Sequence, residues 1–110
     1  MKFTILLGLL ISGMTYASEN VGEKLFIANC TSCHGADGKA QTDVGKAVKA
    51  RNLISDEFKQ AKDKKKVTEE DILGTLKTGV PGTGMASFAH LPEADRKAIA
   101  KYVIALKNKK

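Results

Sequence analysis

The feature that most constrains this chain is the run Cys30-Thr31-Ser32-Cys33-His34. Residues at i and i+3 share one face of a helical turn, so both thiols can add to the two vinyl groups on one edge of a porphyrin. The histidine that follows can then place its imidazole on the iron. The pattern predicts covalent haem attachment, with Cys30 and Cys33 as thioether anchors and His34 as the proximal iron ligand.

Two cysteines at this spacing can serve three other roles. A zinc site of the usual kind needs four ligands at one locus, and beyond the motif the chain offers the distant His90 without a second paired cluster. A dithiol oxidoreductase would place its pair after a buried strand, and no valine- or isoleucine-rich run precedes Cys30. An exported chain could also form a plain disulfide, which leaves His34 without a role.

The first 17 residues have the pattern of a secretory signal peptide. Lys2 supplies a positive charge, residues 4–11 are a short apolar core, and Thr15 and Ala17 are small residues at the −3 and −1 positions of a cleavage site. The apolar segment is too short to span a bilayer, which disfavours an uncleaved membrane anchor. We therefore expect residues 1–17 to be a signal peptide and residues 18–110 to be one exported domain.

Helical signals dominate the expected mature chain. A polar cap candidate at Ser18 opens a helix that runs to the haem motif, a capping-box pattern begins at Thr68, and Pro92 marks the start of the last helix. Val21 and Phe26 belong to an apolar stripe on the first helix. Strand signals are weak, so the chain predicts an all-α fold of about four to five helices around one covalently bound haem.

Met85 is the candidate sixth iron ligand. Met1 and Met14 lie in the expected signal peptide, so Met85 would be the only thioether of the mature chain. A lone methionine is more often core filler. However, Met85 lies in a glycine-rich loop, where the chain can approach a flat ring closely. His90, the only other histidine, is the alternative ligand.

The chain resembles the small bacterial class I cytochromes c, which carry a single haem, over essentially all of its mature sequence. This family pairs a glycine and an aromatic four apart on its first helix with an apolar residue and an aromatic three apart on its last. Gly22 with Phe26, and Ile99 with Tyr102, stand at those spacings. The resemblance implies a cytochrome c fold with crossing N- and C-terminal helices, haem c, and iron ligation by a histidine and Met85.

Two positions depart from the family pattern. Many members have proline directly after the ligand methionine, where this chain has Ala86, which leaves the loop less rigid. Many also have a proline whose carbonyl orients the proximal imidazole, and here none lies between His34 and Pro81. We expect another acceptor for His34. Arg51 and Asn52 are candidates to bind a haem propionate.

Basic residues give the chain a formal net charge of +6, which falls to +5 when Lys2 is removed with the signal peptide. This charge either keeps a small protein soluble or steers it toward an acidic partner. Lys39, Lys77 and Lys101 are candidates for the surface around an exposed haem edge. Nucleic acid is disfavoured, because the basic runs have no interleaved aromatics and export is expected.

Two axial protein ligands leave no open iron position, so the chain is expected to be an electron carrier and not an enzyme. It would be a periplasmic, soluble monomer without stable membrane insertion. Its partners would be redox proteins such as a membrane oxidase, a cytochrome bc1-type complex or a dehydrogenase. The alternatives are a gas-binding or peroxide-reactive haem protein with a labile or missing sixth ligand, and a subunit of a membrane oxidase or dehydrogenase complex.

Overall fold

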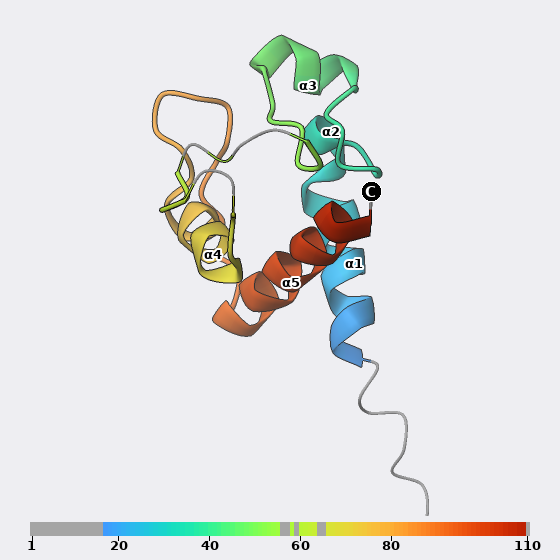
Figure 1. Ribbon diagram of the computed structural model, residues 1–110, viewed down its shortest axis with the longest axis vertical. Coiled ribbons are helices and arrows are strands. Elements are labelled where there is room, and N and C mark those ends of the chain that lie inside the picture. Colours follow the sequence, from blue (N-terminus) through green and yellow to red (C-terminus); the bar gives the residue numbers. More distant parts are fainter. Residues whose placement is uncertain (1–16, 56–57, 59, 64–65, 110) are drawn as a thin grey trace, which may run out of the picture.

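The computed structural model describes residues 17–55, 58, 60–63 and 66–109, which contain five helices and no strand (Figure 1). The helices are α1 (Ala17–Asn29), α2 (Thr31–His34), α3 (Asp43–Val48), α4 (Glu69–Thr78) and α5 (Glu93–Lys109). The all-α prediction is confirmed. Most of the expected signal peptide, residues 1–16, lies outside the described residues. None of the described helices is long and apolar enough to cross a membrane.

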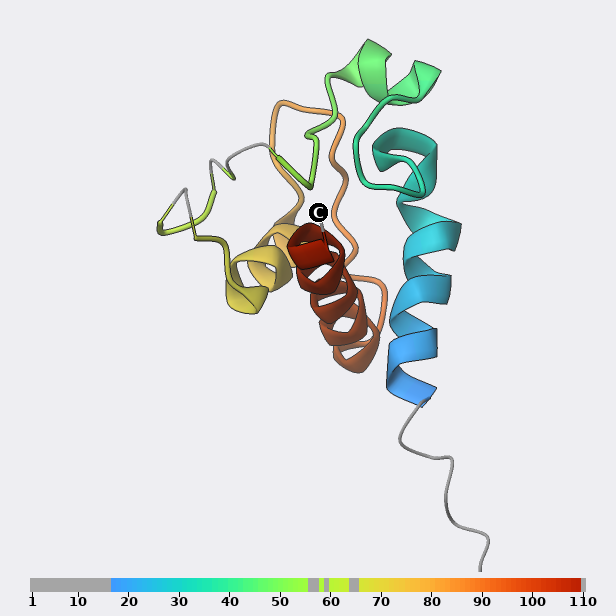
Figure 2. The same cartoon turned by 45° about the vertical axis from the view of Figure 1, so that its right-hand side comes forward.

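Helices α1 and α5 cross at Gly22 (Figures 1 and 2). A Cβ atom at Gly22 would meet the backbone carbonyl of Ala98 and lie 3.2 Å from the Cβ of Tyr102. One turn along α1, Phe26 is only 1% exposed, and its ring centroid lies 5.2 Å from that of Tyr102. Ile99 is also 1% exposed. The expected crossing of the N- and C-terminal helices is therefore confirmed, and glycine is what allows their backbones to meet.

Replacement by alanine should have opposite effects on stability at two helical glycines, of which one lies at the crossing and the other does not. Glycine normally costs a helix about 0.5–1 kcal/mol relative to alanine. Gly74→Ala in α4, where a Cβ would meet nothing within 4 Å, should therefore stabilise the holo-protein by that amount. Gly22→Ala should instead destabilise it by about 1–3 kcal/mol, because the added methyl overpacks the contact with Ala98. Urea unfolding of both variants checks this, and stabilisation by Gly22→Ala would contradict it.

Helix α4 begins with the predicted capping box and packs against α5. The Thr68 hydroxyl accepts from the Asp71 amide at 3.2 Å, and the Asp71 carboxylate accepts from the Thr68 amide at 2.9 Å. Such caps satisfy amides that have no partner within the helix. The apolar core then joins α1, α4, α5 and the chain after α3. Its buried members are Phe26, Leu53, Ile54, Ile72, Leu76, Ile99, Ala100, Val103 and Leu106.

Candidate haem site

The cysteine motif forms a helical turn that extends α1. The Cys30 amide donates to the Phe26 carbonyl at 2.8 Å, and the His34 amide donates to the Cys30 carbonyl at 2.8 Å. Cys30, Cys33 and His34 are each partly buried and line one cavity, and both thiols are free. The structure therefore brings the three predicted residues to one wall, with the spacing on a helical turn that the motif requires.

The Cys30 thiol lies in surroundings that suppress its ionisation. Burial, and to a smaller extent the neighbouring Cys33, raise the pKa of Cys30 to about 11. Reactive dithiol enzymes have the opposite property, because their nucleophilic cysteine has a lowered pKa. The environment of Cys30 thus disfavours the oxidoreductase alternative. Among the described residues, no cluster of three or more histidine, cysteine or acidic side chains is placed to hold a metal ion.

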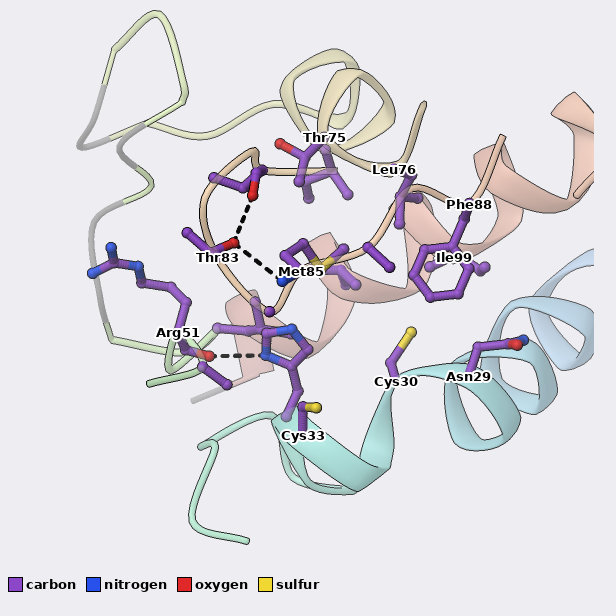
Figure 3. Close-up of a pocket in the computed structure, with 18 of the residues that line it drawn as sticks. Asn29, Cys30, Cys33, Arg51, Thr75, Leu76, Thr83, Met85, Phe88 and Ile99 are labelled. Carbon is purple, nitrogen blue, oxygen red and sulfur yellow. Dashed lines mark hydrogen bonds between the residues drawn. The ribbon is translucent and has the colours of Figure 1, made fainter. Parts of the chain in front are cut away.

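The His34 ring is oriented by a backbone carbonyl that comes from a distant part of the chain. Its Nδ1 lies 2.9 Å from the carbonyl oxygen of Arg51, a bond drawn in Figure 3. A carbonyl can only accept, so Nδ1 carries the proton and Nε2 presents its lone pair. Burial lowers the pKa of His34, and the bond to Arg51 opposes that shift in part. The neutral imidazole at neutral pH is the form that binds a metal.

The segment that carries the Arg51 carbonyl is fastened on both sides. Before it, the Ala50 amide donates to the Gly45 carbonyl at 2.8 Å. After it, the side-chain oxygen of Asn52 accepts from the amides of Ile54 and Ser55 at 2.9 and 3.2 Å. Asn52 therefore uses its oxygen to hold this turn. Of the two propionate candidates, Arg51 is the one that lines the cavity.

Helix α3 packs its first turn against the haem motif. The Thr42 hydroxyl donates to the Ser32 carbonyl at 2.7 Å and accepts from the Gly45 amide at 2.9 Å, which caps α3. A Cβ atom at Gly45 would meet the carbonyl of Cys33, so only glycine allows this approach. The start of α3 is thereby fixed on the turn that contains both cysteines.

Met85 lies in the loop between α4 and α5 and lines the same cavity as His34. The loop starts with a turn in which the Thr83 amide donates to the Val80 carbonyl at 3.1 Å, and Gly82 has a φ of 82°. Proline at the second position and a positive φ at the third are the signature of a type II turn. His90, the alternative ligand, is exposed and is not among the residues that line the cavity.

The cavity has a volume of about 330 Å³ and mostly apolar walls. Helices α1, α4 and α5 supply part of its hydrocarbon lining, which includes Phe26, Ile72, Leu76, Ile99 and Val103. Its polar contributors include the thiols, His34 and Lys49. Two free thiols on one wall, an imidazole with an unprotonated Nε2 and an apolar interior fit a porphyrin attached through thioethers. The residues present therefore fit haem c.

The family model for cytochrome c matches residues 20–107. The chain belongs to the cytochrome c family. Its cofactor is accordingly haem c, with iron, and the sequence prediction of both family and cofactor is confirmed.

Three relatives of this cytochrome c share parts of its sequence or fold. It is 33% identical over 85 residues to the cbb3-type cytochrome c oxidase subunit FixP of Bradyrhizobium diazoefficiens, which covers 77% of this chain and 26% of FixP. The c-type cytochrome KustC0563 matches with a TM-score of 0.62 and 30% identity, over 78% of this chain and 96% of that one.

The third similarity concerns the fold alone. The reducing HAO-like protein complex Kustc0457/Kustc0458 of Kuenenia stuttgartiensis contains a chain that matches with a TM-score of 0.67 and 23% identity. That match covers 78% of this cytochrome c and 41% of the other chain. This cytochrome c thus spans about a quarter of the length of FixP and less than half of the HAO-like chain.

Sequence reasoning missed parts of the site that depend on the tertiary fold. The acceptor for His34 is a backbone carbonyl, and every residue has one, so no residue type marks Arg51. Lys49 lines the cavity, whereas the lysines proposed for the haem edge, Lys39, Lys77 and Lys101, are not among its lining residues. Thr83, two residues before Met85, was a usable signal for a hydrogen-bonded loop, because threonine hydroxyls often bond to nearby backbone groups.

Proposed function

We propose that this cytochrome c is a single-electron carrier, with haem attached through Cys30 and Cys33 and iron ligated by His34 and Met85. The observation that carries the proposal is that one cavity receives both thiols, the oriented imidazole of His34 and the side chain of Met85. When bound, the haem iron supplies the one-electron chemistry. Two protein ligands leave no position for substrate, so the protein is not an enzyme.

The residues around the cavity have separate tasks in this proposal. The Arg51 carbonyl holds the tautomer of His34 that offers Nε2 and makes the imidazole a stronger donor. Apolar walls such as Phe26 and Leu76 exclude water, so little solvent has to reorganise around the site. The Arg51 guanidinium would bind a haem propionate by a charge-assisted hydrogen bond.

The proposed carrier is exported to the periplasm, where it would be a soluble monomer. The support is the sequence pattern of residues 1–17, with a positive start, a short apolar core and small residues before position 18. Residues 18–110 would then be the mature cytochrome c domain. The mature protein should begin at or within a residue or two of Ser18, and N-terminal sequencing of the extracytoplasmic fraction that returns Met1 would contradict this.

The proposed partners are redox proteins of a respiratory chain with acidic docking surfaces. Lys49 supports this, because it is exposed and lines the haem cavity. It directly follows the short helix α3, on which Lys46 is exposed. Lys97, in the first half of α5, forms an ion pair with Glu93 at 3.8 Å. The start of α5 lies away from α3 in Figures 1 and 2.

We expect oxidation of the reduced protein by an acidic redox partner to slow as salt is raised, because exposed charges are screened over about 8–10 Å at physiological ionic strength. Lys49→Gln should lower the rate at low salt and flatten its salt dependence, whereas Lys97→Gln should do neither. Stopped-flow measurement at a series of salt concentrations checks this. A rate independent of salt would mean that the lysines serve solubility alone.

A second candidate function is that of a subunit in a larger oxidase complex. The likeness to FixP, itself named as an oxidase subunit, favours this candidate. Affinity purification of the tagged, haem-loaded protein from both the membrane and the soluble fractions separates the two functions. Stoichiometric recovery of oxidase subunits supports the complex, whereas recovery of the cytochrome alone from the soluble fraction supports the carrier.

A further inference from the structure

The loop that carries Met85 is closed by the hydroxyl of Thr83. This hydroxyl donates to the Val80 carbonyl at 2.7 Å and accepts from the Met85 amide at 3.1 Å, two bonds drawn in Figure 3. The Val80 amide also donates to the Met85 carbonyl at 3.0 Å. Thr83 therefore ties the beginning of the loop to the backbone of Met85 itself.

The other side of Met85 is bonded to the end of α4. The last carbonyls of a helix have no partner within it. Here the Ser87 hydroxyl donates to the Lys77 carbonyl at 2.6 Å and accepts from the Ala89 amide at 3.1 Å. The Phe88 amide donates to the Leu76 carbonyl at 2.6 Å. The residues directly after Met85 are thus fixed to a helix that is itself packed on α5.

The backbone of the loop also lies directly against the first residue after α4. A Cβ atom at Gly79 would lie 2.8 Å from the Met85 carbonyl oxygen and 2.8 Å from the carbonyl carbon of Ala86. Ala86 itself adds little stiffness, because alanine does not restrict the backbone as a proline would. What fixes the path of the loop on either side of Met85 is therefore hydrogen bonding, and side-chain hydroxyls supply several of the bonds.

We propose that Thr83 and Ser87 are positioning residues that keep the Met85 loop closed and the thioether on the iron. The proposal rests on the proposed role of Met85 as ligand. The loop alternates between a closed form and an open form that frees the sixth position. One ordinary net hydrogen bond supports a population ratio of about fivefold. Loss of either hydroxyl should therefore raise the open population about fivefold, and loss of both more than tenfold.

Added imidazole measures this opening, because it can reach ferric iron only when Met85 has left. Its apparent affinity then rises in proportion to the open fraction. Thr83→Val and Ser87→Ala should each bind imidazole about fivefold more tightly than the wild-type holo-protein. Thr83→Ser and Ser87→Thr keep the hydroxyl and should bind it as the wild type does.

Thr68→Ala separates loop opening from general destabilisation. It removes a cap at the opposite end of α4, so it should lower the unfolding midpoint without changing imidazole affinity. Equal gains in Thr68→Ala and Thr83→Val would overturn the positioning role. Wild-type imidazole affinity in both Thr83→Val and Ser87→Ala would also overturn it. A large gain of imidazole affinity in Met85→Ala would then still identify Met85 as the ligand. If Met85→Ala changes neither spectrum nor affinity, Met85 is not the ligand and the proposed function fails as well.

Discussion

Met85→Ala is expected to open the sixth iron position, so that the ferrous protein binds carbon monoxide stoichiometrically and the reduction potential falls. A thioether ligand stabilises ferrous iron and raises the potential, and its removal reverses both effects. Reduced spectra with and without carbon monoxide, together with a redox titration, measure them. The wild-type protein should bind little carbon monoxide under the same conditions.

His90→Ala is the matched control for this prediction. The His90 ring lies beside Phe88, with a centroid separation of 5.8 Å, and is exposed outside the haem cavity. Its removal should change neither the spectrum nor the potential. If His90→Ala opens the iron and Met85→Ala does not, His90 is the ligand. If the wild-type protein itself binds carbon monoxide readily, the gas-binding or peroxide-reactive alternative replaces the carrier.

The helices that could be predicted from the sequence are those with strong local signals. The capping box at Thr68 and the proline before α5 mark helix starts within a few residues of chain, so no tertiary information is needed. A close approach of another backbone at Gly22 is also predictable, because a glycine inside a helix costs stability unless another backbone needs the space. That this backbone belongs to the last helix was implied by the resemblance to the cytochrome c family, because no local signal names the partner of α1.

Other features depend on how the elements meet and were misjudged or missed. Val21 was assigned to the apolar stripe with Phe26, yet it is 37% exposed, because α5 crosses α1 on the face of Gly22 and Phe26. The cysteines and the histidine of the haem motif lie within about one helical turn, so their common role could be predicted from their spacing. The Arg51 carbonyl reaches His34 through the packing of α3, and the sequence has no signal for that path.

Replacement of both Cys30 and Cys33 by alanine should release the haem from covalent attachment and leave the polypeptide largely unfolded. The cavity shares its walls with the apolar core at Phe26, Leu76 and Ile99. Without haem these apolar walls would face water, so the core would lose much of the burial that stabilises it. A domain of this size has little other buried surface to offset that loss.

Acid-organic extraction and circular dichroism check this result in protein expressed with haem-maturation machinery. The double variant should lose its haem to the organic phase and show little helix without it. Cys33→Ala alone keeps one thioether, so it should hold its haem through extraction and remain folded. A stably folded, haem-free double variant would show that the helices bury enough apolar surface by themselves, and that haem is not needed to complete the core.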